Sequence, residues 1–192
     1  MKTRMTSMLI RALGALLAAC CLQAAAGPIL SILPSSPMVL PGQTFSATVA
    51  IENASDLFAY QFDLAFNPGL LRITNVTEGS FLPSVGPTVF FPGTIDNRAG
   101  QLAFTVGTLT DGLPGASGDG GLVRIDFQAL GTGGISGLSL SNLILLNSSL
   151  VEIADASVIP GQVAVVPEPG TLLLLCSMVL GMQLALRRKP RH

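Results

Sequence analysis

Cysteine, histidine and lysine are absent from the central part of this 192-residue chain. The cysteines are Cys20, Cys21 and Cys176, the single histidine is His192, and both lysines also lie in the two terminal segments. A domain without these residues has no disulfide framework, no zinc site built on cysteine or histidine, and no Ser-His-Asp or Cys-His catalytic group. The sequence therefore excludes the commonest hydrolase and zinc chemistries for the central domain.

Charged residues are scarce as well. They make up 11% of the chain, against about 25% in typical soluble domains, whereas 49% of the residues are hydrophobic. The apolar excess is concentrated in residues 1–26 and 167–192. Between these ends lie ten acidic residues and three arginines, a formal net charge of −7. A negative field repels phosphate backbones, so nucleic acid is not an expected partner.

Residues 1–26 have the features of a secretory signal peptide in the usual order. Lys2, Arg4 and Arg11 are followed by an apolar run over residues 12–22 and by small residues that end at Ala26. A basic start, a short apolar run and an A-x-A site define such a peptide, and this run is too short to span a bilayer. We predict a signal helix that signal peptidase removes by cleaving after Ala26.

A second interpretation of this segment stays open. The sequence Leu17-Ala18-Ala19-Cys20 resembles the box that precedes the lipidated cysteine of lipoproteins. Under this interpretation Cys20 becomes the lipidated amino terminus, whereas cleavage after Ala26 removes it.

The carboxy-terminal segment combines a proline-containing motif, an apolar run and a basic tip. The motif is Val166, Pro167, Glu168, Pro169, Gly170 and Thr171, and the tip contains Arg187, Arg188, Lys189 and Arg191. Residues 172–186 carry no charge, and a helix over residues 171–186 would be roughly 24 Å long, slightly short of the hydrocarbon layer and just able to span it. Because the run is apolar on all sides rather than striped, we predict a single transmembrane helix. The basic tip is expected to stay in the cytoplasm, which leaves the rest of the chain outside.

The order of these three parts resembles the PEP-CTERM sorting signal of Gram-negative, biofilm-forming bacteria, over residues 166–192. The resemblance implies that an exosortase, a transpeptidase-like enzyme of the inner membrane, cuts near the Pro-Glu-Pro motif. The processed protein would lose its helix and move to the cell surface or the extracellular polysaccharide. The prolines favour an extended, accessible strip beside the bilayer. The alternative is a plain linker before an ordinary membrane anchor.

The chain between the two ends has a hydrophobic period of two, which is typical of half-buried strands. Phe58, Tyr60, Phe62, Leu64 and Phe66, for example, alternate with small or polar residues. The expected strands cover residues 45–51, 58–66, 71–77, 88–91, 101–109, 122–129, 135–146 and 157–166. Glycine and proline clusters separate them, and no amphipathic helix intervenes. This pattern predicts one all-β domain over residues 27–165, an antiparallel sandwich or jelly roll of about eight or nine strands.

Three stretches of this domain resemble the cohesin domain, over about residues 28–165. They are Pro41-Gly42-Gln43-Thr44-Phe45, residues 57–71 with the sequence LFAYQFDLAFNPGLL, and residues 121–127 with the sequence GLVRIDF. The resemblance implies a nine-stranded jelly-roll β-sandwich that binds rather than catalyses. Cellulosomal members bind dockerins, and relatives occur in carbohydrate-linked surface proteins. Asn67 stands where cohesins commonly have aspartate, and the chain contains no dockerin-like helical calcium repeat.

Two kinds of site chemistry remain possible for the acidic residues. A glycosidase needs only two carboxylates, and candidates are Asp56, Asp63, Asp96, Asp111, Asp119 and Asp126. No spacing selects a pair, and Asp63 and Asp126 fall on strand positions that predict a solvated face. The glycine-rich loop from Asp111 to Asp119 offers carboxylates and carbonyls to calcium, although it lacks EF-hand spacing. We expect no cofactor, with calcium at Asp111 and Asp119 as the one candidate.

The sequence therefore predicts a non-catalytic surface or extracellular-matrix protein. Its domain would bind polysaccharide or another surface protein after transit through the inner membrane and exosortase processing. The alternatives are a cohesin-type scaffold that binds a protein partner, and a small two-carboxylate glycosidase.

Overall fold

The computed structural model describes residues 27–167 except Asp111, Leu113 and Thr132, together with residues 178, 182 and 183. The expected signal helix, the cleavage site after Ala26 and Cys20 lie outside these residues, and so does most of the carboxy-terminal segment, including its basic tip. None of the helices in the described part of the chain is long and apolar enough to cross a membrane.

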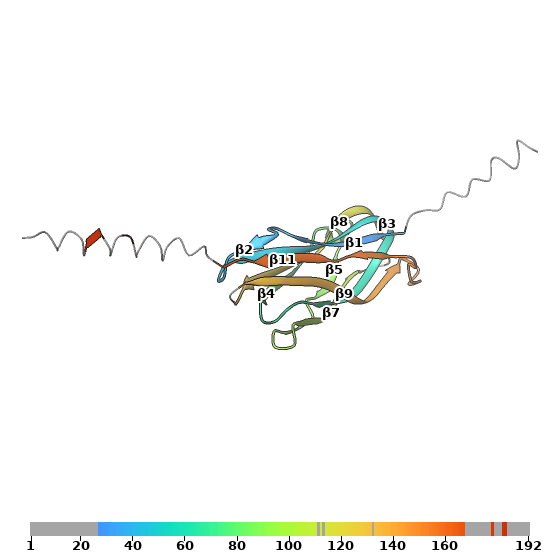
Figure 1. The fold of residues 1–192 in the computed structure, drawn as a ribbon. Helices are drawn as coiled ribbons and strands as arrows, with labels where there is room; N and C mark the ends of the chain where they lie inside the picture. Colours follow the sequence, from blue (N-terminus) through green and yellow to red (C-terminus); the bar gives the residue numbers. More distant parts are fainter. Residues whose placement is uncertain are drawn as a thin grey trace, which may run out of the picture.

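Within residues 27–167 the described regular structure is almost entirely β-strand (Figure 1). The elements are β1 (Ile29–Pro34), β2 (Met38–Val39), β3 (Thr44–Ala65), β4 (Leu71–Glu78), η1 (Leu82–Ser84), β5 (Thr88–Phe91), β6 (Thr94–Asp96), β7 (Gln101–Leu109), β8 (Ala116–Ala129), β9 (Gly134–Asn147), β10 (Ser157–Ile159) and β11 (Gly161–Val165). The all-β fold class is confirmed.

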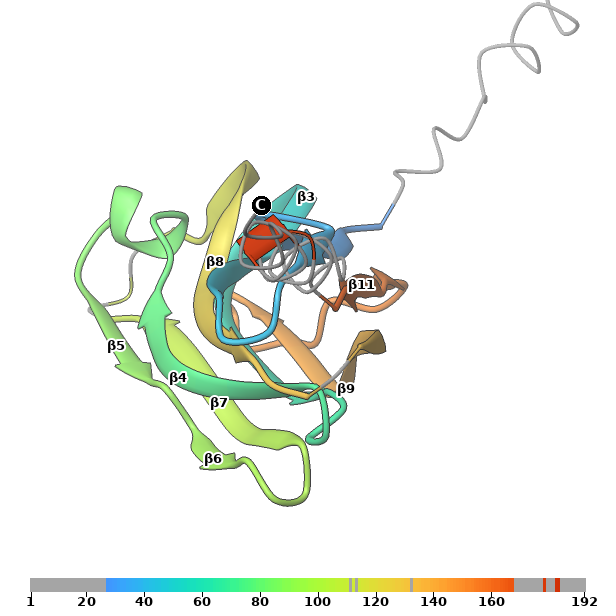
Figure 2. The ribbon, with the colours of Figure 1, turned by 60° about the vertical axis from the view of Figure 1, so that its left-hand side comes forward.

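The strands form two layers because the long strand β3 passes from one layer to the other. Its first half pairs with β1 and β8, which in turn pair with β10 and β4. Its second half pairs with β7 and β9. Strands β5 and β6 lie along the outer edge of β7 (Figure 2). Strand β11 pairs with β9 and β2 with β11, so these two strands continue the layer beyond β9. Asn53 and Asp56, both at positive φ, lie where β3 changes layer.

This crossing explains how the observed strands differ from the expected ones. The described residues form eleven strands, so the expected number of about eight or nine is too low. The two strands expected over residues 45–51 and 58–66 are halves of β3. The strand expected over residues 157–166 is divided into β10 and β11 at Pro160. Strands β1, β2 and β6 were not expected, because they are too short or too apolar to give an alternating pattern.

The core between the layers is built from the inward positions of the alternating strands. Phe127 of β8 stacks on Phe45, with ring centroids 5.3 Å apart, and meets Phe66 edge to face at 5.7 Å. Tyr60 lies across the core: from the second half of β3 its hydroxyl donates a 3.0 Å hydrogen bond to the carbonyl of Leu122 in β8. Burial, and secondarily Glu78, raises the pKa of this hydroxyl. Tyr60 therefore connects the two layers with a protonated donor.

The two ends of the sandwich are distinguished by where the described chain begins and ends. Strand β1 begins at one end, and β11 finishes at the opposite end (Figure 1). We refer to these as the Gly27 end, where Gly27 abuts Asp155, and the Pro167 end, where the Val166 amide donates to the Val39 carbonyl. The two ends are thus distinct from the outer faces of the two layers, which a ligand approaching from the side would meet.

Candidate functional site: an exposed sheet face around Asp63

The outer face of the layer formed by β5, β7, β3 and β9 carries an exposed apolar surface. Residues paired directly across neighbouring strands point to the same side of a sheet, so the register gives two transverse rows on this face. The first row is Val89, Thr108, Ala59 and Leu146, and the second is Phe91, Val106, Gln61 and Ile144. Six of these eight side chains are apolar, and Val89, Phe91 and Ile144 are exposed.

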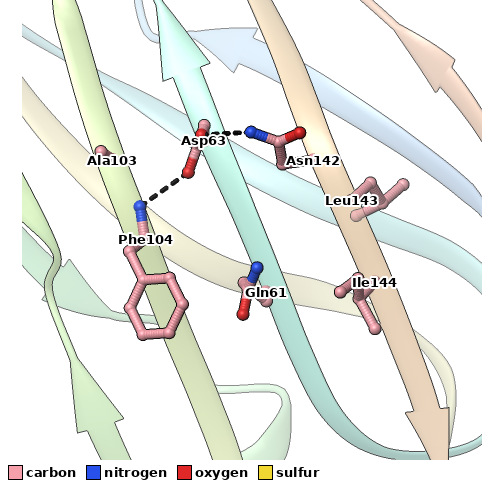
Figure 3. Close-up of a pocket in the computed structure, with 7 residues that line it drawn as sticks. All are labelled: Gln61, Asp63, Ala103, Phe104, Asn142, Leu143 and Ile144. Carbon is pink, nitrogen blue, oxygen red and sulfur yellow. Dashed lines mark hydrogen bonds between the residues drawn. The ribbon is translucent and has the colours of Figure 1, made fainter.

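Asp63 lies at the next outward position of β3 and connects the flanking strands (Figure 3). One carboxylate oxygen accepts a 2.7 Å hydrogen bond from the Phe104 amide of β7. The other accepts a 2.6 Å hydrogen bond from the Asn142 side-chain amide of β9. The residue is only 8% exposed despite its place on the outer face. Asp63 therefore fixes the backbone of β7 and the side chain of β9, and we name this surface the Asp63 face.

Both flanking strands are irregular at the level of Asp63. The register of β3 with β7 shifts between Phe62 and Leu64, and the register with β9 shifts between Gln61 and Asp63. The bulged residues Phe104 and Asn142 have φ of 60° and 50°. Left-handed backbone is unfavourable for a bulky residue such as phenylalanine, and strain of this kind is concentrated at functional sites. The bulge directs the Phe104 side chain outward, where it is 61% exposed.

The bulges leave a shallow depression of about 500 Å³ on the Asp63 face. Gln61, Asp63 and Asn142 supply its polar lining, and Phe104 and Ile144 are among its apolar residues (Figure 3). An apolar surface with a few fixed polar groups at its centre resembles the core of a protein–protein interface. The lining offers no histidine, cysteine or second acid with which Asp63 could form a catalytic pair.

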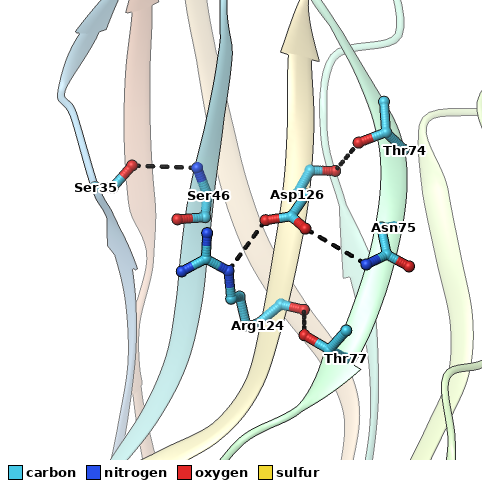
Figure 4. A network of polar contacts seen from close by, with 7 residues as sticks. All are labelled: Ser35, Ser46, Thr74, Asn75, Thr77, Arg124 and Asp126. Carbon is cyan, nitrogen blue, oxygen red and sulfur yellow. Dashed lines mark hydrogen bonds and ion pairs between the residues drawn. The ribbon is translucent and has the colours of Figure 1, made fainter.

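The opposite layer has an outer face of different character. A depression of about 600 Å³ on this face is lined mostly by polar side chains, among them Ser46, Thr74, Arg124 and Asp126. The Arg124 guanidinium bonds the Asp126 carboxylate at 3.1 Å, and its side chain is still 58% exposed (Figure 4). The Thr74 hydroxyl donates to the Asp126 carbonyl. We call this surface the Arg124 face.

The cohesin-domain family model matches residues 34–165. The chain belongs to the cohesin family. No curated protein sequence matches it significantly. Cohesin domains are non-catalytic protein-binding modules, so the predicted absence of enzymatic activity is confirmed by family membership and the glycosidase alternative is wrong.

Solved cohesin structures have the same fold as this domain. A non-cellulosomal cohesin from the archaeon Archaeoglobus fulgidus is similar with a TM-score of 0.60 and 20% identity, over 77% of this chain and 97% of that one. A type II cohesin from the cellulosome of Acetivibrio cellulolyticus gives 0.59 and 16%, over 71% and 95%. The third cohesin of ScaC from the same organism, solved in complex with the ScaB dockerin, gives 0.59 and 17%, over 72% and 99%.

The candidate residues from the sequence do not gather at one site of this cohesin. Asp63 was expected on a solvated face, and this expectation is wrong because Phe104 and Asn142 cover and bond its carboxylate. Asp126 is partly exposed on the Arg124 face. Asp119 accepts a 2.8 Å hydrogen bond from the Asn53 amide, whereas Asp111 lies outside the described residues. Among the residues that the structure describes, no group of three or more histidine, cysteine or acidic residues is placed to hold a metal.

Asp56 is held by hydrogen bonds at the Gly27 end. The Ser148 hydroxyl and amide donate to one carboxylate oxygen at 2.7 and 3.2 Å, and the Gly115 amide donates to the other at 2.8 Å. The Ser148 hydroxyl, followed by the Gly115 amide, lowers the pKa of Asp56 below its ordinary value of 3.8. The ionised carboxylate thus joins the point where β3 changes layer to the loop before β8 and the turn after β9.

This arrangement predicts an acid-dependent contribution to stability. Because the pKa of Asp56 is lowered by folding, its contribution is present above pH 3.8 and is lost as the pH falls through the lower folded value. We expect Asp56→Asn to destabilise the domain at pH 6 and to have a smaller effect at pH 2.5, as measured by urea unfolding at both pH values. An equal loss at both would contradict a role for the ionised carboxylate.

Proposed function

We propose that this protein is exported to the cell surface or matrix, where its cohesin domain binds a protein partner through the Asp63 face. The observation that carries the proposal is Phe104, an exposed aromatic side chain on a left-handed bulge whose amide is held by Asp63. Neither its exposure nor its backbone conformation benefits the isolated domain. Both are understandable if the side chain fills a pocket on a partner, because buried aromatic anchors carry much of the energy of interfaces.

The rows beside Phe104 define the chemistry of the partner. Phe91, Val106 and Ile144 offer apolar contact across three strands, and Gln61 lies between Val106 and Ile144 with both amide donors and an acceptor. The fitting partner presents a protein surface with its own apolar side chains rather than a charged one. A dockerin-type module is one such class, since several similar cohesins were solved in complex with dockerins. It would come from another chain.

The terminal segments supply delivery in this proposal. Signal peptidase removes residues 1–26 by cutting after Ala26, and residues 166–192 act as a PEP-CTERM sorting signal with an inner-membrane helix over residues 171–186. Exosortase then cuts near the motif of Val166, Pro167, Glu168, Pro169, Gly170 and Thr171. The order of motif, uncharged run and basic tip in the sequence supports this route.

Mass spectrometry of the intact protein tests the route. In a host that makes an exosortase, we expect the protein from the outer fraction to begin at Gly27 and to end between Pro167 and Gly170. In a matched host without the enzyme, residues 172–192 should remain. Retention of these residues in both hosts would make the segment an ordinary anchor, and a lipidated Cys20 at the amino terminus would contradict cleavage after Ala26.

Polysaccharide is the second candidate ligand, and the Arg124 face is the observation that favours it. Hydroxyl, guanidinium and carboxylate groups line a broad depression there, and they provide both donors and acceptors for sugar hydroxyls. Among the contacts of the described residues, Arg124 donates to the Asp126 carboxylate only through its Nε atom. The other N–H groups of the exposed guanidinium are free of this contact and can donate to a sugar. Matrix glycan retained by the wild type and lost in Arg124→Ala, with retention unchanged in Phe104→Asp, would support this ligand.

A further inference from the structure

A second exposed apolar patch lies at the Pro167 end. Met38 of β2 and Ile135 of β9 both pair with Ala164 of β11, one from each side, so their side chains emerge on the same face. They are 59% and 61% exposed. Val166, the next outward position after Ala164, is also exposed, and it lines a small apolar hollow with Met38 and Leu40. We call Met38, Leu40, Ile135 and Val166 the apolar collar.

The loops around the collar contain no charged residue. Residues 35–43, 66–70, 130–135 and 166–167 are all uncharged in the sequence. Among the described residues, charges near this end belong to Arg72, which pairs with Gln128, and to the β6–β7 turn with Asp96 and Arg98. In the sequence Glu168 follows Pro167 directly. The two arginines and two acids balance, so the Pro167 end is close to neutral, and it is apolar at the collar.

The Gly27 end has the opposite character. Four acids are placed there by their backbone or side-chain neighbours. Glu52 pairs with Ile29 of β1, Asp155 abuts Gly27, Asp119 accepts from the Asn53 amide, and Glu152 forms an isolated β-bridge with Leu146. Asp56 lies beside them, where β3 changes layer. No lysine or arginine occurs in residues 27–71 or 125–166, the two segments that contain all of these acids except Asp119. The charge of −7 is thus concentrated away from the collar.

The sequence brings the collar close to the expected membrane anchor. Pro167 packs against Gly133, so the chain is held to the domain up to this residue. Only Glu168, Pro169 and Gly170 separate it from the expected transmembrane run, and three extended residues reach about 10 Å at most. A domain held so close to a bilayer must bring part of its Pro167 end to the headgroups.

We propose that the apolar collar docks on the lipid surface while the chain is still anchored. This inference rests on the carboxy-terminal anchor in the proposed function and adds to it an orientation. Met38, Ile135 and Val166 enter the interfacial region, as exposed apolar side chains do at a membrane surface. The acidic Gly27 end is repelled by anionic lipid and points away. The Asp63 face then stands along the membrane normal, open to a partner, and the Pro-Glu-Pro motif is held at the headgroups.

Depth-dependent fluorescence quenching tests the orientation. The protein used is residues 27–192 with Cys176→Ser. It is reconstituted into vesicles of phosphatidylethanolamine and phosphatidylglycerol. The quencher is a phosphatidylcholine with a spin label near its headgroup, included in the same vesicles. An environment-sensitive fluorophore is attached to Ile135→Cys or, as the matched control, to Val151→Cys, which replaces a similarly exposed β-branched residue near the Gly27 end. We expect at least threefold stronger quenching of the fluorophore at position 135 than at position 151. Its emission should be blue-shifted at position 135 and unshifted, as in water, at position 151.

The outcomes separate this inference from the proposal on which it rests. If alkaline carbonate leaves the chain in the vesicles but both labels are quenched equally, docking is overturned and the anchor stands. If carbonate extracts the chain, the anchor and the docking fail together. Adding Met38→Glu to the Ile135-labelled chain should reduce the quenching toward the control value while extraction resistance is retained, and unchanged quenching would overturn the role of the collar.

Discussion

Phe104→Asp is expected to lower the affinity of this cohesin for its protein partner by about 100-fold, the loss typical of removing a central aromatic anchor. The side chain is exposed on the bulge beside Asp63, so its removal costs little core packing. Aspartate also tolerates left-handed backbone better than phenylalanine does. The variant should therefore unfold at the same urea concentration as the wild type. Titration calorimetry with the partner retained by the wild-type domain measures the change.

Leu150→Asp is the matched control for this variant. Leu150 is also an exposed apolar residue with φ of 60°, but it lies in the loop after β9, near the Gly27 end. Its substitution introduces the same charge in the same backbone conformation without touching the centre of the Asp63 face. We expect its affinity to remain within about twofold of the wild type. A similar loss in both variants would mean that charge, rather than the Phe104 contact, governs binding.

Gly107→Ala is expected to destabilise the domain by about 3 kcal/mol, the upper part of the usual range for overpacking a core. A Cβ atom at this position would lie 2.4 Å from the Tyr60 ring, where no real Cβ contact is found. The ring cannot move freely because its hydroxyl bonds the Leu122 carbonyl across the sandwich. Displacing it breaks this hydrogen bond in a buried setting, which adds to the cost.

Urea unfolding of the same domain with Gly137→Ala provides the comparison. Gly137 is also a strand glycine, but a Cβ atom there meets nothing within 4 Å. We expect this variant to be as stable as the wild type or slightly more stable, because alanine restricts the unfolded chain. Equal destabilisation by both substitutions would show that loss of glycine, and not the contact with Tyr60, is responsible.

The sequence was informative wherever side-chain alternation reports which face of a strand is buried. The alternation of residues 58–66 predicted the inward positions of Tyr60, Phe62 and Leu64, which form part of the core. The family resemblance to cohesins was likewise confirmed. The union of two expected strands into β3 escaped prediction, because Asn53 and Asp56 between them look like an ordinary polar turn.

The candidate site was predicted less well than the fold, for a physical reason. A bulge adds one residue to one strand, and its effect depends on the partner strand, which alternation within a single segment does not report. Asp63 was therefore assigned to a solvated face, whereas two bulges enclose it. The sequence does not mark the bulge in β7, because Leu102, Phe104 and Val106 alternate without a break and alternation alone places all three on one face. In the structure Leu102 is buried, whereas Ala103 and Phe104 in succession are partly or fully exposed.

Site-specific photo-crosslinking tests the binding face most directly. A benzophenone amino acid replaces Phe104 in one variant and Thr44, at the exposed edge of the Arg124 face, in another. Each protein is produced in a host whose surface fraction retains the wild type, and is then irradiated in place. We expect a covalent adduct with one polypeptide from position 104 and none from position 44. Adducts from position 44 alone, or with glycan in place of protein at either position, would contradict it.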